Sequence, residues 1–307
     1  MLKIFRKFIV LEDAELKPLL WSFLYFFCLL AGYYIMQPLR DELGLQGGLE
    51  NLPWLFMASM LVMLVANPLF SWLFHRWPRR TLIPLVYQFF ALNLVFFFVL
   101  LHSPEGELRN RAAQGFFLWV SVFNLFAVSV FWSVMADVFT TDQGRRLFGC
   151  VGAGGTFGEL FGSGLTWLLS PKLGALNLLL ISLLFLEVAV WAFYGIVQYA
   201  KPEGKPASGG ALPSHEGSTT SSRSKGPAAL AGLRLTASSP YLLGICLFML
   251  LYTFTSSFLY FAKMAIVKEF FSSPEARTAF FASINLWVSG LTIITQLGVT
   301  GRLIPWL

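Results

Sequence analysis

The stretch that decides the fold is Phe131–Gly164, which reads FWSVMADVFTTDQGRRLFGCVGAGGTFGELFGSG. It leaves one apolar span, passes through a short charged turn and enters a second span that is rich in glycine. Gly154, Gly158 and Gly162 recur at every fourth position, which places three bare backbone patches on one face of a helix. Small residues at this spacing let a neighbouring helix approach closely within a bilayer. The stretch therefore predicts two spans, the second of which packs tightly against another helix.

The glycines also admit an alternative, because Gly152–Gly158 resembles the fingerprint of a dinucleotide-binding loop. The last glycine of this run falls one place late, and two arginines precede the run where a β-strand is required. No acidic residue lies near positions 175–180, about 20 residues further on, where one would bind the ribose. Close helix packing is the better interpretation.

The composition indicates an integral membrane protein. Hydrophobic residues make up 56% of the 307 residues and charged residues only 12%, which is more apolar surface than a soluble domain of this length could bury. Cys28, Cys150 and Cys246 lie inside apolar spans and show no disulfide or metal-site spacing. The net charge of +6 comes from residues scattered over short loops, which favours membrane orientation over nucleic-acid binding.

Eight apolar spans are each long enough to cross about 30 Å of hydrocarbon as a helix. They are Leu19–Met36, Leu52–Phe74, Leu82–Leu101, Phe116–Val138, Leu147–Leu169, Leu176–Gln198, Tyr241–Phe261 and Ala279–Val299. If the N-terminus is cytoplasmic, cytoplasmic segments hold 15 of the 22 lysines and arginines, a clear positive-inside bias. We therefore expect a multi-pass protein of a bacterial inner membrane with its N-terminus in the cytoplasm.

Lys201–Ser239 interrupts this series of spans. It is rich in proline, glycine, serine and alanine and cannot bury a core, so it predicts a flexible cytoplasmic linker. We expect three parts: a six-helix bundle over residues 1–200, the linker over 201–239, and two helices of a partial second bundle over 240–307.

Six spans, a long cytoplasmic loop and further spans resemble the organisation of the major facilitator superfamily. The loop after the second span adds to this likeness, because Ser71 followed by His75–Arg80 (HRWPRR) resembles the superfamily signature G-x-x-x-D-R-x-G-R-R. The three arginines of the signature correspond to Arg76, Arg79 and Arg80. Membrane orientation alone is the alternative explanation for these arginines.

Longer stretches resemble bacterial proteins of the ATP/ADP antiporter type, which are similar to the major facilitators in fold. These stretches are Gly32–Gly44 (GYYIMQPLRDELG), Glu50–Trp54 (ENLPW), Met135–Phe139 (MADVF) and Arg145–Gly149 (RRLFG). The resemblance implies an all-α membrane bundle and secondary transport by alternating access, with ATP and ADP among the candidate solutes. RDEL at Arg40–Leu43 stands in place of the lysine-containing pattern of nucleotide exchangers, which weakens a nucleotide assignment.

Transporters of this kind have about twelve spans in two halves. Eight spans therefore indicate a C-terminally truncated chain, with a self-contained eight-span relative as the alternative. In the first case the last two spans begin the second half, and spans one and seven are equivalent helices of the two halves.

Polar side chains inside the spans mark candidate positions for solute binding, because an ionised acid costs about 3 kcal/mol at mid-bilayer. The candidates are Tyr33, Gln37, Arg40, Glu159, Ser256, Tyr260, Lys263, Asn285 and Gln296. Arg40 and Lys263 end the polar faces of the equivalent spans one and seven, and two cations at one cavity suit a phosphate or carboxylate. Their alternative role is anchoring at the membrane interface. Glu159 is a coupling or cavity-lining acid, or alternatively a hydrogen-bonded packing residue.

Asp137 stands at the cytoplasmic end of span four, and Arg76, Arg79 and Arg80 follow span two on the same side. We expect Asp137 to pair with one of these arginines and to form part of a cytoplasmic gate. The alternative is that Asp137 caps its own turn or faces solvent.

The sequence as a whole predicts a secondary transporter for a small anionic solute. We expect no covalent chemistry, no enzymatic activity, no cofactor or metal, no nucleic acid and no obligate protein partner. The expected partners are the lipid bilayer and the solute. The alternative is an inactive transporter remnant or a membrane scaffold.

Overall fold

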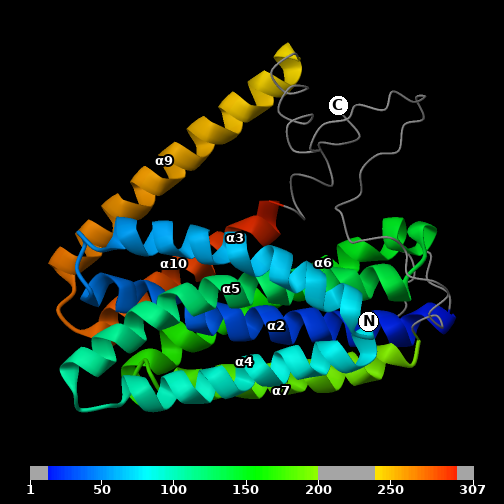
Figure 1. The fold of residues 1–307 in the computed structure, drawn as a ribbon, viewed down its shortest axis with the longest axis horizontal. Coiled ribbons are helices and arrows are strands. Elements are labelled where there is room, and N and C mark those ends of the chain that lie inside the picture. The colour runs from blue at the N-terminus through cyan, green and yellow to red at the C-terminus, as the bar shows by residue number, and fades with distance from the viewer. Residues whose placement is uncertain (1–12, 200–238, 296–307) are drawn as a thin grey trace. The chain divides into compact units, whose positions relative to one another are not determined.

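The computed structural model describes residues 13–199 and 239–295, and this part of the chain is all-helical (Figure 1). Its helices are α2 (Asp13–Gln46), α3 (Leu52–Arg76), α4 (Arg79–Leu101), α5 (Gly106–Val138), α6 (Thr141–Leu173), α7 (Leu178–Val197), α9 (Pro240–Phe270) and α10 (Pro274–Thr295). Six of the predicted spans lie entirely within a helix, Leu176–Gln198 slightly exceeds α7 at both ends, and Ala279–Val299 is described only to Thr295, where α10 ends. Several helices extend beyond the apolar pattern; α2, for example, continues past Met36 to Gln46.

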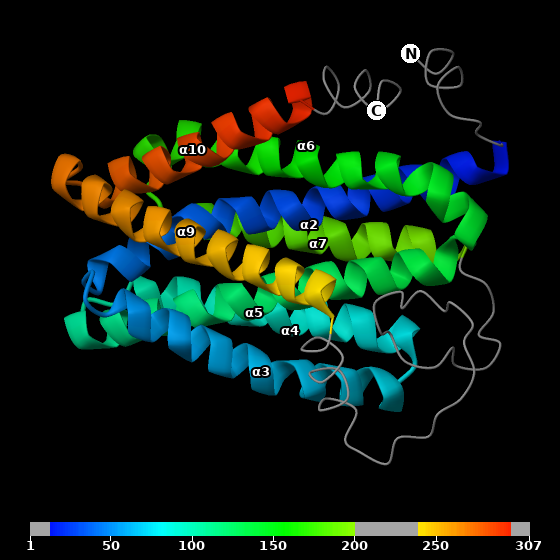
Figure 2. The same ribbon diagram turned by 90° about the horizontal axis from the view of Figure 1, so that it is seen from above.

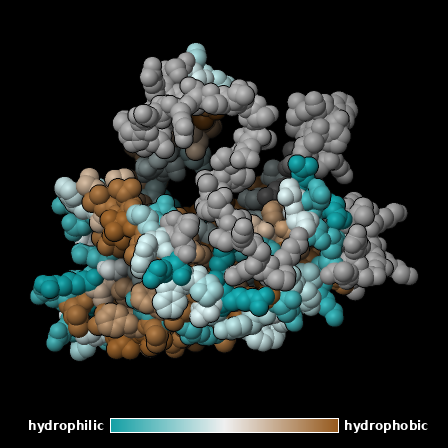
Figure 3. Space-filling view, turned by 45° about the vertical axis from the view of Figure 1, so that its right-hand side comes forward, coloured by the Kyte–Doolittle hydropathy of each residue, from teal (hydrophilic) through white to brown (hydrophobic). Residues whose placement is uncertain are grey.

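Seven of these helices are long and apolar enough to cross a membrane, as expected of a multi-pass integral membrane protein. The exception is α6, which has 33 residues but is rich in glycine. Large apolar side chains are exposed along the helices, and Figure 3 shows them as brown areas on the face turned to the viewer. In a membrane protein such side chains face lipid.

The central helix of the bundle is α2, and α5, α6, α7 and α10 pack around it (Figures 1 and 2). Three glycines of α6 lie against the backbone of α2. The facing pairs are Gly154 with Phe23, Gly158 with Phe27, and Gly162 with Ala31. Because both numbers rise together, α6 runs parallel to α2. A Cβ atom at Gly158 or Gly162 would lie 2.4 Å from a carbonyl oxygen of α2, so the predicted close packing is confirmed.

The two ends of the bundle are named from α2: the proximal end is where α2 begins and the distal end is where it finishes. Helix α7 runs antiparallel to α2, because Trp21 near the start of α2 contacts Trp191 near the end of α7, with ring centroids 4.8 Å apart. At the other end of α7, the Ser182 hydroxyl donates to the Gly32 carbonyl at 2.9 Å. The run from α2 to α7 therefore starts and finishes at the proximal end, as expected for six helices that alternate in direction.

The core between α2, α4, α5 and α7 is aromatic. Tyr25 of α2 and Tyr87 of α4 are fully buried, and their hydroxyl oxygens lie 2.6 Å apart. Phe131 of α5 and Phe193 of α7 pack against the ring of Tyr25. The bond gives each hydroxyl oxygen a partner in this apolar layer, which lowers the cost of burying the two groups.

Helices α2 to α7 and α10 belong to one compact unit, and α9 belongs to a second. The predicted division into a first bundle, a linker and a partial second bundle stays a prediction. The predicted linker lies outside the described residues except for Ser239, and so does Gln296.

Candidate functional site

Five of the predicted solute-binding residues meet on three helices and are called the polar cluster. They are Tyr33, Gln37 and Arg40 of α2, Glu159 of α6 and Asn285 of α10, and all five are half-buried. The Asn285 amide donates to the Gln37 side-chain oxygen at 3.2 Å. Glu159 and Arg40 both act electrostatically on the Tyr33 hydroxyl. Tyr33, Gln37 and Arg40 are spaced at i, i+4 and i+7 and therefore share one face of α2.

The carboxyl of Glu159 meets a tyrosine hydroxyl of α2 and not a basic side chain. Its carboxyl interacts with the hydroxyl of Tyr34, the neighbour of Tyr33. Within the described residues no lysine or arginine nitrogen lies within 4.0 Å of this carboxyl. The acid is therefore held by a neutral hydroxyl next to the polar cluster.

The guanidinium of Arg40 is held at the interface of α2 and α5. Its Nε and Nη2 atoms donate to Oδ1 of Asp41 at 3.2 and 2.8 Å, and its carbon lies 4.8 Å from the centroid of the Phe117 ring. Nη1 lies 3.5 Å from the Ser121 hydroxyl. The Arg40 side chain is only 12% exposed, and α2 continues beyond it to Gln46. This placement favours a role inside the bundle over anchoring in the headgroup layer.

Ser256, Tyr260 and Lys263 lie on α9, where the Lys263 ammonium is 4.9 Å from the centroid of the Tyr260 ring. Because α9 belongs to the second unit, the expected convergence of Arg40 and Lys263 on one cavity stays a prediction.

A buried ion pair at the distal end joins α2 to α10, and sequence reasoning missed it. Arg277 of α10 donates to both carboxylate oxygens of Glu42, from Nε at 2.7 Å and from Nη2 at 2.9 Å. Gln46 donates to the same carboxylate at 2.9 Å, and Glu42 is 0% exposed. The signal in the sequence was Arg40-Asp41-Glu42. Arg40 and Asp41 pair with each other, so the third charge, Glu42, needs a partner on another helix.

At the proximal end, Arg79 at the start of α4 forms an ion pair with Asp137 near the end of α5. The expected contact is therefore present, while its role as a gate stays a prediction. Arg76 and Arg80 are exposed and make no ion pair with a described residue. Of these three arginines, Arg79 is thus the one that binds the Asp137 carboxylate.

A second proximal contact joins the starts of α2 and α6, and sequence reasoning missed it as well. Glu15 of α2 is 4% exposed and accepts hydrogen bonds from Gln143 at 3.0 Å and Arg146 at 2.9 Å. Gln143 is placed by a capping box with Thr140 at the start of α6. The signal was the T-x-x-Q pattern of Thr140–Gln143, which is typical of a helix start.

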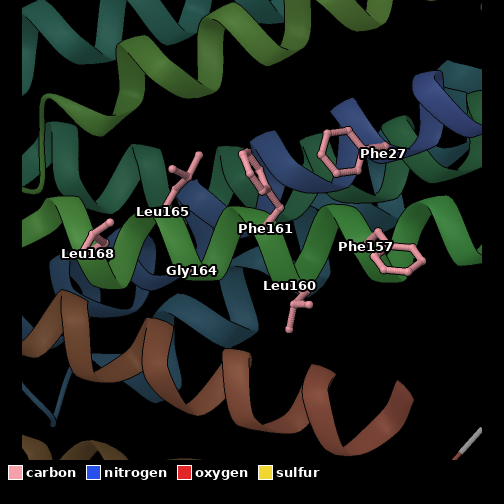
Figure 4. Close-up of a pocket in the computed structure, with 7 residues that line it drawn as sticks. All are labelled: Phe27, Phe157, Leu160, Phe161, Gly164, Leu165 and Leu168. Atoms are coloured by element: carbon pink, nitrogen blue, oxygen red, sulfur yellow. The ribbon is translucent and has the colours of Figure 1, made fainter. Parts of the chain in front are cut away.

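A cavity of about 380 Å³ lies elsewhere, along α6 and beside Phe27 of α2 (Figure 4). It is lined by Phe27, Phe157, Leu160, Phe161, Gly164, Leu165 and Leu168. None of these side chains is polar, and no residue of the polar cluster is among them. This cavity can hold hydrocarbon, but it offers nothing to bind an anionic solute.

No family model, curated protein or solved structure matches the chain. The likeness to major facilitators and to ATP/ADP antiporters therefore rests on the sequence stretches quoted above. What the fold itself establishes is an all-helical membrane bundle organised around α2.

Proposed function

We propose that this protein is a secondary transporter that moves a small anionic solute across the membrane by alternating access. The observation that carries the proposal is Arg40, a cation inside the bundle on the same face of α2 as Tyr33 and Gln37, of which Gln37 accepts a hydrogen bond from Asn285 of α10. Polar and charged side chains are expensive in a membrane and usually face a partner or a solute pathway.

The chemistry of the polar cluster suits a carboxylate or phosphate. A guanidinium binds either group through two parallel hydrogen bonds. Asp41 partly neutralises Arg40, so an arriving anion must compete with this carboxylate. The competition keeps binding reversible, as transport requires. Gln37 and Tyr33 share a face of α2 with Arg40, and Asn285 bonds to Gln37, so all three add neutral hydrogen-bonding groups.

Alternating access needs a solute that binds the inward-open and outward-open states differently. Gln37 belongs to α2 and Asn285 to α10. A movement of one helix against the other would therefore change the affinity for a solute held between them. Glu159 would act as a cavity-lining or coupling acid on the third helix. ATP and ADP stay among the candidate solutes, together with inorganic phosphate and small dicarboxylates.

The test is uptake into liposomes that contain the purified protein. The panel consists of labelled phosphate, a four-carbon dicarboxylate, and ATP against internal ADP. We expect saturable uptake of at least one anion, and its loss in Arg40→Ala with membrane insertion unchanged. Arg111→Ala is the matched control, because Arg111 is exposed and, among the described residues, pairs only with Glu107 of its own helix.

The absence of flux for every anion would reject transport and support the alternative of an inactive remnant or scaffold. Normal uptake by Arg40→Ala at unchanged KM would show that transport does not depend on Arg40. The polar cluster would then not be the binding site.

A further inference from the structure

One polar pair lies on the outer surface of the bundle, near the middle of its two helices. Gln88 is close to the centre of α4 and Glu187 close to the centre of α7. The Gln88 amide donates to Oε2 of Glu187 at 2.9 Å. Gln88 is exposed and Glu187 is half-buried. Helices α4 and α7 pack side by side and form the lower edge of the bundle in Figure 1.

The surroundings of this pair are apolar. Leu85 and Leu92 of α4 and Leu184 and Trp191 of α7 are each more than half exposed, at 56%, 70%, 63% and 60%. They flank Gln88 and Glu187 at helical spacing on the same surface. A carboxyl at this depth is costly if it is ionised and unpartnered, because lipid chains offer neither a donor nor an acceptor. An ordinary lipid-facing surface is apolar throughout, whereas this one carries a polar pair at its centre.

The pair does not use its full hydrogen-bonding capacity. A glutamine amide carries two N–H donors and a carbonyl acceptor, and a carboxyl has two oxygens. Within the described residues, one bond between Gln88 and Glu187 is the only one that either side chain makes. One N–H and the carbonyl oxygen of Gln88 are left, together with Oε1 of Glu187.

We propose that the α4–α7 surface is the interface of a homodimer in which the Gln88–Glu187 pairs of two copies bond to each other. A twofold axis along the membrane normal keeps every residue at its own depth, so the two pairs meet at the same level. The groups left on one copy complement those left on the other. An ionised carboxylate accepts the partner's second amide N–H, and a neutral carboxyl donates to the partner's amide oxygen.

The second copy is favoured over an unrelated helix because the match needs no further residue type. Two amides and two carboxyls close a ring of four hydrogen bonds, with the apolar side chains of both copies around it. Interhelical hydrogen bonds of this kind stabilise association within membranes.

The first test measures dimer formation of the full chain in liposomes at increasing dilution, by single-molecule photobleaching. We expect a dimer for the wild type and a rise of about tenfold in its dissociation constant for Glu187→Leu and for Gln88→Leu. Glu187→Gln should keep the dimer, since an amide supplies both a donor and an acceptor. Asn93→Leu is the matched control on α4, because the Asn93 amide donates to the Phe89 carbonyl of its own helix at 2.7 Å.

The second test leaves the pair intact and does not depend on the leucine variants folding. Leu184→Cys, in a background with Cys28, Cys150 and Cys246 replaced by alanine, should give a disulfide-linked dimer on oxidation in native membranes. Leu64→Cys on the exposed surface of α3 should not. A monomer at every dilution would overturn the proposal. Cross-linking of Leu184→Cys to a different protein would also overturn it. The same holds if Glu187→Leu and Gln88→Leu lower the stability of the fold but leave the dissociation constant of the dimer unchanged.

Discussion

Glu42 of α2 and Arg277 of α10 form a bidentate ion pair although 235 positions separate them in the chain. The Arg277 side chain is 14% exposed and that of Glu42 is fully buried, so the two charges are stable there only together. Arg277 also donates to the Phe271 carbonyl at 3.0 Å, which fixes the turn before α10. The pair therefore holds the start of α10 on the distal end of α2, beside the polar cluster.

Removing one member of this pair should be far worse than removing both. Arg277→Met leaves a buried carboxylate without its counter-charge and should lower the free energy of unfolding by about 3–5 kcal/mol. The double variant Glu42→Met with Arg277→Met should recover most of that loss. Thermal unfolding in detergent micelles measures both. A double variant no more stable than Arg277→Met would show that the charges themselves are not the cause.

The glycines of α6 should tolerate alanine very unequally. Gly158→Ala places a Cβ 2.4 Å from the Phe27 carbonyl oxygen, which forces α6 away from α2 and should destabilise the bundle by about 1–3 kcal/mol. Gly152→Ala is the control on the same helix, since nothing lies within 4 Å of its Cβ, and it should be neutral or slightly stabilising. The melting temperatures of the two variants decide this. Equal losses at both positions would point to helix propensity instead of close packing.

The helices and the close contact of α2 with α6 could be predicted from the sequence because both depend on local spacing. Apolar runs of about 20 residues must be helical in lipid, since every backbone polar group needs a partner within its own segment. Gly154, Gly158 and Gly162 mark one face by themselves. The helix ends were less predictable, because α2 continues to Gln46 through charged residues whose partners lie on other helices.

Contacts between residues distant in sequence were predictable only where the order of the spans places both residues on the same side of the membrane. Asp137 and the arginines near Arg79 belong to loops and helix ends on one side, so their contact followed from the order of the spans. The pairing of Glu42 with Arg277 depends on how α10 docks on α2, which no periodicity along the chain encodes. Gln37 and Asn285 were both candidates for solute binding, but their contact also needed that docking.

Replacing Glu159 separates its two interpretations. If this acid lines the solute pathway or couples transport, Glu159→Gln should lower the uptake rate about tenfold, because the amide keeps the size but loses the charge. The unfolding temperature should stay close to that of the wild type. Tyr34→Phe is the companion variant, since Tyr34 is the hydroxyl that meets this carboxyl. Unchanged uptake combined with a lower melting temperature in both variants would assign Glu159 to packing.

The ion pair between Arg79 and Asp137 should matter more for transport than for stability. Both side chains are partly exposed, at 33% and 43%, and exposed pairs contribute only about 0–1 kcal/mol to folding. Arg79→Ala and Asp137→Ala should therefore unfold almost like the wild type. If the pair closes the proximal end in one of the two transport states, each variant shifts the balance between them and slows transport.

A double-mutant cycle on the uptake rate provides the decisive measurement for this gate. Two residues that act through one contact lose their effect together, so the double variant should be little worse than either single variant. Arg80→Ala is the control, because Arg80 belongs to the same loop, is exposed and makes no ion pair with a described residue. It should leave uptake unchanged if only the Arg79 contact matters. Strictly additive losses of uptake for Arg79→Ala and Asp137→Ala would mean that the two side chains act independently. An equal loss of uptake for Arg80→Ala would mean that the arginines serve only to orient the protein in the membrane.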